Sequence, residues 1–335
     1  MRRWVRLSGS LLSVLLIEPL SAEAAPWRDP SPHTVRFVTV DDGVRLEVLD
    51  WGGSGRAVVL LAGGGNTAHV FDDFAPKLAT RYRVYGITRR GFGASGFAQS
   101  PNPVDRLRED LLSALAVLAL DRPVLAGHSI AGAEMSAVAL AQPQRIAGLV
   151  YLDAAYPYAF DDGTGPAMRE FTAVEGLGHP TPSAADLKSF AALQQWEEHV
   201  DGFRTPEAEL RQTWESDGKA PTGKHRDFPG SRVFSTILGG ARKHDRIPVP
   251  ALALFALPHV PERWLRESSD PTVQKVSRAY FTTIDALTEK QAKAIETDVP
   301  TARVVRVPGS HYIFISNQSD VRHEMRTFID SLKWP

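Results

Sequence analysis

The chain has 335 residues, of which 43% are hydrophobic and 23% charged, and this is the composition of a folded globular protein rather than a disordered one. Lys plus Arg number 38 and Asp plus Glu number 39, which gives a formal net charge of -1. This balance excludes a nucleic acid or an anionic membrane as the main partner, because both require a basic surplus. The absence of cysteine excludes a disulfide scaffold, a cysteine nucleophile and thiolate metal ligands. The length suits one large α/β domain that carries an inserted subdomain.

The first residues have the three parts of a secretory signal peptide. A basic start over residues 1–6 precedes the apolar run from Leu7 to Ile17, and the small-x-small pattern Ala22-Glu23-Ala24 follows. The apolar run is shorter than the roughly 20 residues that a membrane span needs. We therefore predict that residues 1–24 are a signal peptide. The mature chain would be exported to a periplasm or to the medium, without a membrane anchor.

The strands are predicted from two kinds of hydrophobic pattern. Residues 35–40 and 44–49 alternate around Asp41-Asp42-Gly43, which predicts a β-hairpin with one solvent-facing side. Short continuous apolar runs predict strands that are buried on both faces of a parallel sheet. These runs lie at residues 57–62, 124–126, 147–152 and 251–257.

Helical patterns alternate with these strands. Residues 104–120 carry an apolar stripe, residues 130–141 follow the next strand, and residues 321–332 close the chain. A hairpin followed by repeated strand–helix units predicts a doubly wound, mostly parallel α/β sheet.

The segment 156–248 departs from this rhythm. It has helical stretches at residues 184–200 and 206–214, no convincing core strand and many large aromatic residues. We predict a helical cap inserted after the sixth strand, above the carboxyl ends of the strands, where open α/β sheets bind ligands. The core domain would then comprise residues 33–155 and 249–335. An uncharged, aromatic-rich cap favours an apolar small-molecule substrate.

The strongest chemical signal is Gly127-His128-Ser129-Ile130-Ala131-Gly132, which lies between a predicted buried strand and a predicted helix. Small residues allow a sharp turn there, so the Ser129 side chain would project from a strained corner as a nucleophile. The backbone N–H of Ile130 would point into the same space, at a helix N-terminus that favours developing negative charge.

This motif, the Gly63-Gly64-Gly65 loop, the turn at residues 90–95 and the late Gly309-Ser310-His311 together resemble the α/β-hydrolase fold superfamily. The resemblance covers nearly all of the mature chain and implies that fold. It also implies an oxyanion hole made by the backbone N–H groups of Gly64 and Ile130. Two positions depart from the family pattern, with Ala62 in place of the usual histidine and Ala131 in place of the usual second glycine. Because the donor at Gly64 is backbone, the missing histidine should matter little.

His311 is the predicted general base. It lies at the tip of a loop between the apolar stretch 304–307 and the final helix, so its Nε2 can reach a serine hydroxyl.

The acid of the triad has more than one candidate. The family usually places it just after the strand at residues 251–257, where this chain has no nearby aspartate. Glu262 and Asp270 follow, but both are expected to begin helices. The other family position corresponds to Asp153, at the carboxyl end of the strand at residues 147–152, where it could hold the Nδ1–H of His311. We predict Asp153 as the acid, with Glu262 as the alternative.

Two further motifs do not lead to a cofactor or a metal. Residues 91–96 have the Gly-x-Gly-x-x-Gly spacing of dinucleotide sites, but Pro101 and Pro103 follow too soon for that loop to open a helix. Residues 323–327 approach a zinc-protease motif but have Thr327 where the second histidine is needed. We therefore predict that the protein uses neither a cofactor nor a metal.

A serine, a histidine base and a backbone oxyanion hole are suited to attack on a carbonyl group. We predict a secreted serine hydrolase that cleaves a carboxylic ester through an acyl-enzyme. An amidase, a lactonase, a carbon–carbon bond hydrolase or a cofactor-free lyase would use the same residues and stays open. Epoxide and haloalkane hydrolases are disfavoured because they use an aspartate nucleophile. A non-catalytic ligand-binding member of the fold would have no need to keep Ser129, His311, the glycine loop and an acid together.

Overall fold

The computed structural model describes residues 27–240 and 243–333 of the chain. Residues Met1–Pro30 form one unit and Ser31–Pro335 another, and the account below concerns the second. The predicted signal peptide, residues 1–24, lies outside the described residues. None of the described helices is both long enough and apolar enough to cross a membrane.

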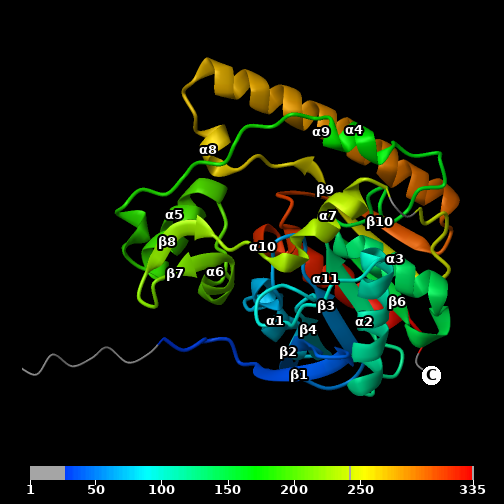
Figure 1. Cartoon of the computed structure of the whole chain (residues 1–335). Helices are drawn as coiled ribbons and strands as arrows, with labels where there is room; N and C mark the ends of the chain where they lie inside the picture. Colours follow the sequence, from blue (N-terminus) through cyan, green and yellow to red (C-terminus); the bar gives the residue numbers. More distant parts are fainter. Residues whose placement is uncertain (1–26, 241–242, 334–335) are drawn as a thin grey trace, which may run out of the picture. The chain divides into compact units, whose positions relative to one another are not determined.

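An eight-stranded sheet forms the centre of this unit (Figure 1). Its strands are β1 (Thr34–Asp41), β2 (Val44–Gly52), β3 (Ala57–Leu61), β4 (Arg83–Ile87), β5 (Val124–His128), β6 (Gly148–Leu152), β9 (Ala251–His259) and β10 (Ala302–Gly309). Their order in the sheet is β1-β2-β4-β3-β5-β6-β9-β10. The β1–β2 and β2–β4 pairs are antiparallel, and all other neighbours are parallel. The prediction of a mostly parallel α/β sheet is confirmed.

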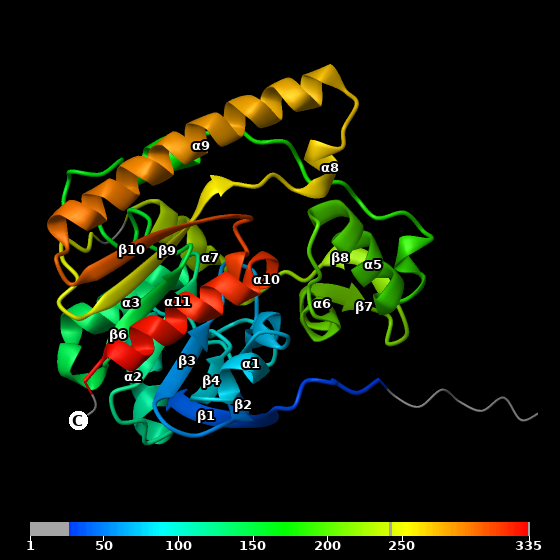
Figure 2. The ribbon, with the colours of Figure 1, turned by 180° about the vertical axis from the view of Figure 1, so that it is seen from behind.

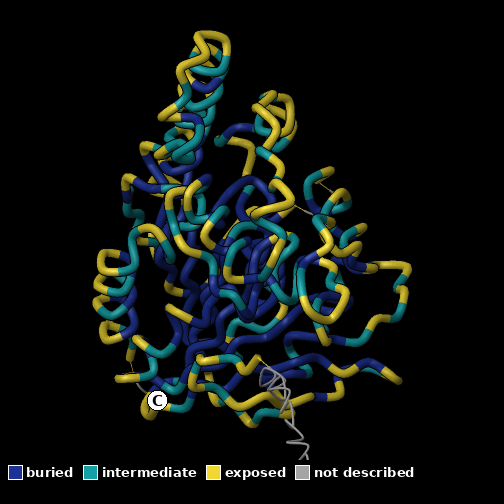
Figure 3. The backbone as a smooth tube through the Cα atoms, turned by 90° about the vertical axis from the view of Figure 1, so that its left-hand side faces the viewer, coloured by how far each residue is buried: buried dark blue, intermediate teal, exposed yellow. Residues whose placement is uncertain are grey.

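Helices cover both faces of the sheet (Figure 2). On one face lie η1 (Ala68–Phe71), α1 (Ala75–Ala79), α10 (Ile313–Ser316) and α11 (Gln318–Ser331), which pack against apolar side chains of the central strands. On the other face lie α2 (Pro103–Val117) and α3 (Ala131–Ala141), and the short turn η2 (Pro143–Arg145) follows α3. Because both faces are covered, the central strands are almost entirely apolar and buried, and the buried backbone is concentrated in the middle of the unit (Figure 3).

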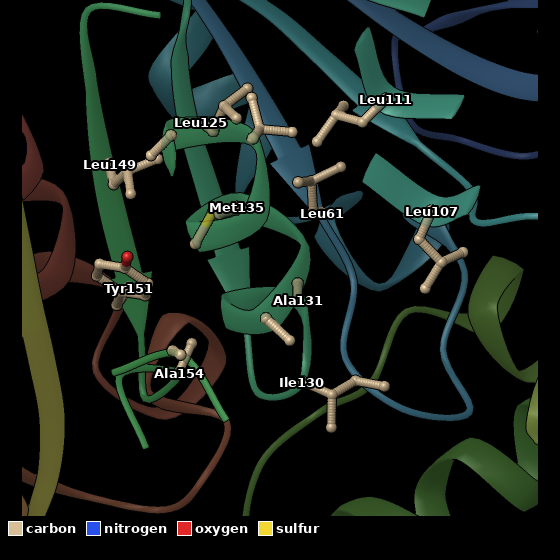
Figure 4. Close-up of a cluster of buried hydrophobic side chains, with 14 of the residues drawn as sticks. Leu61, Leu107, Leu111, Leu125, Ile130, Ala131, Met135, Leu149, Tyr151 and Ala154 are labelled. Atoms are coloured by element: carbon tan, nitrogen blue, oxygen red, sulfur yellow. The ribbon is translucent and has the colours of Figure 1, made fainter. Parts of the chain in front are cut away.

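The junction of β5 and α3 is packed tightly enough to need small residues. Figure 4 shows Met135 of α3 lying against Leu125 of β5 and Tyr151 of β6. A Cβ atom on Gly127 would lie 2.8 Å from the Met135 sulfur, so a larger residue there would push α3 away from the sheet. Burial of each such large apolar side chain contributes about 1.5–3 kcal/mol.

The segment between β6 and β9 forms the cap segment, which we define by the predicted bounds 156–248. It contains α4 (Met168–Thr172), η3 (Asp186–Lys188), α5 (Phe190–Asp201), α6 (Glu207–Thr213), β7 (Trp214–Ser216), β8 (Pro221–His225), η4 (Pro229–Ser231) and α7 (Arg232–Leu238). Helices α5 and α6 lie where they were predicted. The pair β7–β8 is an antiparallel hairpin outside the main sheet, so a purely helical cap was wrong in this detail. The division into core and cap domains stays a prediction.

A second addition separates β9 from β10. It consists of α8 (Arg263–Arg266) and the 28-residue α9 (Pro271–Asp298), which runs along one side of the unit in Figure 1. The Asp270 side chain accepts a hydrogen bond from the Thr272 N–H at 2.7 Å, and Pro271 occupies the first position of the helix. Glu262 is the N-cap residue of α8 but makes no capping hydrogen bond with its side chain. The expectation that Glu262 and Asp270 begin helices is confirmed.

Candidate active site

Ser129 lies at the sharp turn between β5 and α3. Its φ is +52°, in the left-handed region that a residue with a Cβ seldom adopts, and its N–H donates to the Leu152 carbonyl at 3.4 Å. The Ser129 side chain lies near the phenol of Tyr158 in the cap segment, whose pKa burial raises well above its usual range. The turn therefore presents Ser129 from a strained backbone toward the cap segment.

Two glycines permit this close packing. A Cβ atom on Gly132 would lie 2.0 Å from the Ala154 carbonyl oxygen, inside any allowed contact. A Cβ atom on Gly63 would lie 2.6 Å from Nδ1 of His128 and 3.1 Å from the Cβ of Ser129. The glycine loop after β3 consequently lies directly beside the serine turn.

The two predicted oxyanion donors, the N–H groups of Ile130 and Gly64, each follow a residue of this contact in the chain. Ile130 is the N-cap of α3, and Gly64 lies in the loop after β3, where Gly65 has a φ of +78°. Within the described part of the chain, neither the N–H of Ile130 nor that of Gly64 donates to a backbone or side-chain acceptor. Both are thus available to stabilise a negatively charged oxygen, as the N–H groups of an oxyanion hole do.

Asp153 and His311 are hydrogen-bonded to each other. Nδ1 of His311 lies 2.6 Å from Oδ2 of Asp153, whose side chain is completely buried, whereas that of His311 is 42% exposed. Asp153 follows β6 directly and has a φ of +49°, so its backbone turns sharply at the carboxyl end of the strand. This geometry leaves Nε2 of His311 free of the acid.

The remaining lone pairs of Asp153 are also satisfied. Oδ1 accepts hydrogen bonds from the Ala256 N–H and the Tyr156 hydroxyl, each at 2.9 Å. Nε2 of His259 lies 4.0 Å from Oδ2. Burial raises the pKa of Tyr156 well above its usual range, and the Asp153 charge adds to this, so the phenol keeps its proton and donates it. These donors compensate the buried carboxylate.

The alternative acid lies elsewhere. Glu262 precedes α8 and lines the cavity described below, and Asp270 caps α9. Among the described residues, no hydrogen bond or ion pair joins either side chain to His311. The structure brings Asp153 to the histidine, and not Glu262.

His128 contacts His311 through a hydrogen bond and through its ring. Its Nε2 lies 3.0 Å from the His311 carbonyl oxygen, and the two rings are 4.5 Å apart at their centres. Burial lowers the pKa of His128 well below its usual range, with the nearby His311 adding to the effect. A neutral His128 that donates from Nε2 is a structural neighbour of the base rather than a second base.

A cavity of about 890 Å³ opens beside His311 and Gly64 and extends into the cap segment. Aromatic rings form much of its wall, and they come from the cap segment, α9 and the loop before α10: Tyr156, Tyr158, Phe171, Trp196, Phe203, Trp214, Tyr280, Phe281 and Tyr312. Of the aromatic residues noted in the cap sequence, Phe190 and Trp214 belong to a small core within the cap segment, which Leu193 and Leu210 complete.

The cavity wall also carries carboxyl groups, so the uncharged lining expected from the sequence was wrong. Glu197 accepts a hydrogen bond from Nε1 of Trp214 at 3.0 Å, and Asp201 pairs with His179 at 2.8 Å. Burial raises the pKa of Glu197 and that of Glu209 to about 7 in each case. The cavity therefore combines an aromatic wall with acids that titrate near neutrality.

Several residues of this site were not predicted. Tyr156 and Tyr158 closely follow Asp153 in the chain, and this proximity was the available signal for them. Tyr312, whose hydroxyl donates to Oδ1 of Asn66 at 3.0 Å, and Glu209 carry no local motif. Their positions follow only from the tertiary arrangement.

Comparison with known proteins identifies the family. Residues 58–322 match the model of the alpha/beta hydrolase family. The chain belongs to the α/β hydrolase family.

This α/β hydrolase is similar to curated proteins with several different names. It is 25% identical to the pimeloyl-[acyl-carrier protein] methyl ester esterase of Edwardsiella ictaluri over 81% of this chain and 93% of that protein. It is 34% identical to the 2-hydroxy-6-oxononadienedioate/2-hydroxy-6-oxononatrienedioate hydrolase of Cupriavidus pinatubonensis, over 36% of this chain and 44% of that protein. The chain spans less than half the length of the first curated relatives that it matches, with 43% and 42% covered.

Solved structures share the fold of this α/β hydrolase. An E-2-(acetamidomethylene)succinate hydrolase matches with a TM-score of 0.58 and 17% identity, over 89% of this chain and all of the other. The carboxylesterase CesB of Bacillus subtilis matches with a TM-score of 0.52 and 15% identity, over 90% of this chain and 92% of the other.

The glycine turn at residues 91–96 has a structural role in this α/β hydrolase. Arg90 pairs with the buried Asp110 at 2.6 Å, and the Ser95 hydroxyl donates to the Thr88 carbonyl at 2.7 Å. A Cβ atom on Gly91 would lie 2.7 Å from the Gly230 nitrogen. The turn is thus filled by the protein's own backbone. Thr327, in the motif that resembles a zinc site, lies on α11.

Proposed function

We propose that this protein is a serine hydrolase that cleaves a carboxylic ester through an acyl-enzyme. Ser129 is the nucleophile, His311 the general base and Asp153 the acid that orients it. The observation that carries the proposal is the 2.6 Å hydrogen bond from His311 to the buried Asp153, together with the strained strand–helix turn that carries Ser129.

The proposed reaction has two halves. Oγ of Ser129 attacks the ester carbonyl while Nε2 of His311 takes its proton, and the carbonyl oxygen becomes an oxyanion held by the N–H groups of Gly64 and Ile130. His311 then gives its proton to the departing alcohol, which leaves the acyl group on Ser129. A water activated by His311 cleaves this acyl-enzyme, and the serine recovers its proton.

Two observations support an ester as the substrate. A relative that matches 81% of this chain is named as a methyl ester esterase. The cavity beside His311 is large enough for a small molecule, and its aromatic wall favours an apolar acyl or alcohol group. The relative from Cupriavidus pinatubonensis is named as a hydrolase of an oxo-dienedioate, so carbon–carbon bond cleavage by the same residues is the second candidate.

We further propose that the protein is exported. The support is the basic, apolar and small-residue order of residues 1–24 in the sequence. N-terminal sequencing of the protein recovered outside the cytoplasm should begin after Ala24.

The catalytic proposal is tested by mass spectrometry after exposure to a fluorophosphonate, which forms an adduct only with an activated serine. We expect one adduct, on Ser129, that disappears in Ser129→Ala and is strongly reduced in His311→Ala, because the serine then lacks its base. Ser235→Ala on α7, which removes a serine hydroxyl far from the triad in sequence, is the matched control and should label like the wild type.

Hydrolysis of neutral esters, measured beside labelling, separates the remaining functions. A folded protein that neither labels nor hydrolyses any ester would overturn the catalytic proposal and favour a ligand-binding role. Labelling of Ser129 without ester cleavage would favour one of the other reactions open to the same residues, namely cleavage of an amide, a lactone or a carbon–carbon bond.

A further inference from the structure

One acid of the cap segment reaches across to the core. Glu209, on α6, is 1% exposed and accepts hydrogen bonds from two consecutive residues that follow the glycine loop. Its Oε1 accepts from Nδ2 of Asn66 and from the N–H of Thr67, both at 3.0 Å, and its Oε2 accepts from Oγ1 of Thr67 at 2.5 Å. A single cap side chain thus holds both the backbone and the side chains of this short segment.

The segment that Glu209 holds is the downstream end of the proposed oxyanion loop. Asn66 comes two residues after Gly64. Gly65 lies between them with a φ of +78°, and because glycine has no side chain, it cannot fix the loop by packing. The upstream end is held from the core, where Arg89 donates to the Ala62 carbonyl at 2.8 Å and to the Gly63 carbonyl at 3.2 Å. Gly64 therefore lies between one anchor from the core and one from the cap segment.

The downstream anchor also extends to the residue after the proposed base. Oδ1 of Asn66 accepts a hydrogen bond from the Tyr312 hydroxyl at 3.0 Å, and Tyr312 follows His311 directly. Asn66 is thus bound on its amide nitrogen by Glu209 and on its oxygen by Tyr312, which fixes the orientation of its amide group.

We propose that Glu209 is a positioning residue for the oxyanion hole: it holds Asn66 and Thr67 and thereby directs the Gly64 N–H toward the substrate carbonyl. This inference rests on the proposed function. Preorganised oxyanion donors stabilise the charge that develops in the transition state. Complete loss of one donor lowers kcat by about 100- to 1000-fold. Because Glu209 acts through the loop, its removal should have a smaller effect than the loss of the donor.

The charge of Glu209 bears on how strongly it holds the loop. Burial raises its pKa to about 7, although the hydrogen bonds from Thr67 and Asn66 oppose the rise. The other titratable groups that face it are His69 of η1, Glu197 of α5 and Tyr312. A carboxylate accepts all three hydrogen bonds, whereas a protonated acid places a proton where one donor points. The anchor should therefore weaken as the pH falls through about 7.

Kinetics of three variants on a neutral ester test the proposal. We expect Glu209→Ala to lower kcat by about 10- to 100-fold and to change KM by less than about threefold, because transition-state binding is lost and ground-state binding is kept. Glu209→Gln keeps one acceptor oxygen but replaces the other with an N–H donor, so it should lower kcat by about three- to tenfold, less than Glu209→Ala. It should also lack any step in kcat near neutral pH that Glu209 causes. Glu207→Gln, on the same helix and paired with Arg211, is the matched control and should behave like the wild type.

A second measurement covers the case in which Glu209→Ala does not fold. The anchor predicts that Glu209→Gln and Thr67→Val are not additive, so the double variant should lose no more kcat than the worse single variant. Hydrogen exchange of a peptide containing residues 64–67 should be faster in Glu209→Gln than in Glu207→Gln, whether or not a substrate is turned over.

The outcomes separate this inference from the function on which it rests. If the wild type neither labels nor hydrolyses, both fall. If the wild type is active but Glu209→Ala keeps kcat within about twofold, or the losses in the double variant multiply, only the positioning role of Glu209 is overturned.

Discussion

The identity of the acid is a question of single residues, and burial favours one candidate. Asp153 is fully buried with each oxygen in a hydrogen bond, whereas Glu262 is half-buried at a helix start. We predict that Asp153→Asn lowers kcat by about 10⁴-fold, because an amide favours the wrong tautomer of His311. Steady-state hydrolysis of a neutral ester measures this.

Glu262→Gln is the matched comparison for this prediction. It changes a carboxyl group of the same cavity and should leave kcat within about threefold of the wild type. The reverse pattern, with a large loss in Glu262→Gln and a small loss in Asp153→Asn, would assign the acid to Glu262.

Residues with a local signal could be predicted, and residues defined by distant contacts could not. Ser129, Asp153 and His311 each follow the carboxyl end of a recognisable strand, where catalytic side chains of this fold are expected. Glu209 contacts a segment that is 142 residues away in the chain, and nothing in its own helix distinguishes it from Glu207. Only the folded arrangement of α6 against the loop after β3 separates the two acids.

At the scale of elements, the contact between α3 and the loop after β6 determines where Asp153 lies. Gly132 of α3 faces the Ala154 carbonyl so closely that a Cβ atom would lie 2.0 Å from it. We predict that Gly132→Ala lowers the free energy of unfolding by about 1–3 kcal/mol, because backbone must shift to relieve the overlap. Thermal or urea unfolding measures this.

Gly178→Ala is the control for this prediction, since a Cβ atom there would meet nothing within 4 Å. The same shift should move Asp153 relative to His311, so Gly132→Ala should also lose activity at temperatures where it is folded. An unchanged midpoint in Gly132→Ala would show that the helix can move without cost.

The strands that the sequence did not predict lack the hydrophobic pattern by which a strand is recognised. In β4, Gly86 interrupts the apolar pattern because the Trp51 ring lies where its Cβ would be, at 2.8 Å. The hairpin β7–β8 is short and mostly polar, with only Trp214 and Pro221 buried, so it has neither a continuous apolar run nor a clean alternation. Helices α2 and α11 could be predicted because one buried face repeats along each of them, and the central strands because they are continuous apolar runs.

At the scale of the whole molecule, stability should depend on a buried ionic cluster far from the cavity. Asp72 accepts contacts from Nδ1 of His33 at 3.0 Å and from Nδ1 of His69 at 2.9 Å. Burial disfavours the Asp72 charge, but the two nearby histidines outweigh it and hold the pKa of Asp72 below 3.8. The cluster joins the chain before β1 to η1.

The sign of the pH dependence follows from this lowered pKa. Asp72 binds its proton less tightly in the folded state than in the unfolded state, so its ionisation stabilises the fold above the unfolded pKa of 3.8. That contribution is lost as the pH falls through the lower folded pKa. We predict that Asp72→Asn is less stable than the wild type by about 1–3 kcal/mol near neutral pH. Urea unfolding should show the difference shrinking in acid.

Asp227→Asn, a change at an exposed aspartate of the cap segment, is the control and should follow the wild type across the pH range. A difference between Asp72→Asn and the wild type that stays constant into acid would mean that the side-chain shape, and not its charge, stabilises the fold.

The way in which the cap segment is attached has an evolutionary consequence. The pairing of β6 with β9, with Leu152 opposite Leu254, involves no residue of the cap segment, so the sheet would keep its register if that segment were exchanged for another. Lineages could therefore replace the cap to recognise new molecules while they inherit the catalytic sheet intact. Without Glu209, the hydrogen-bond donors of Asn66 and Thr67 would have no acceptor. Selection would therefore favour a replacement cap that supplies an acceptor for these two residues.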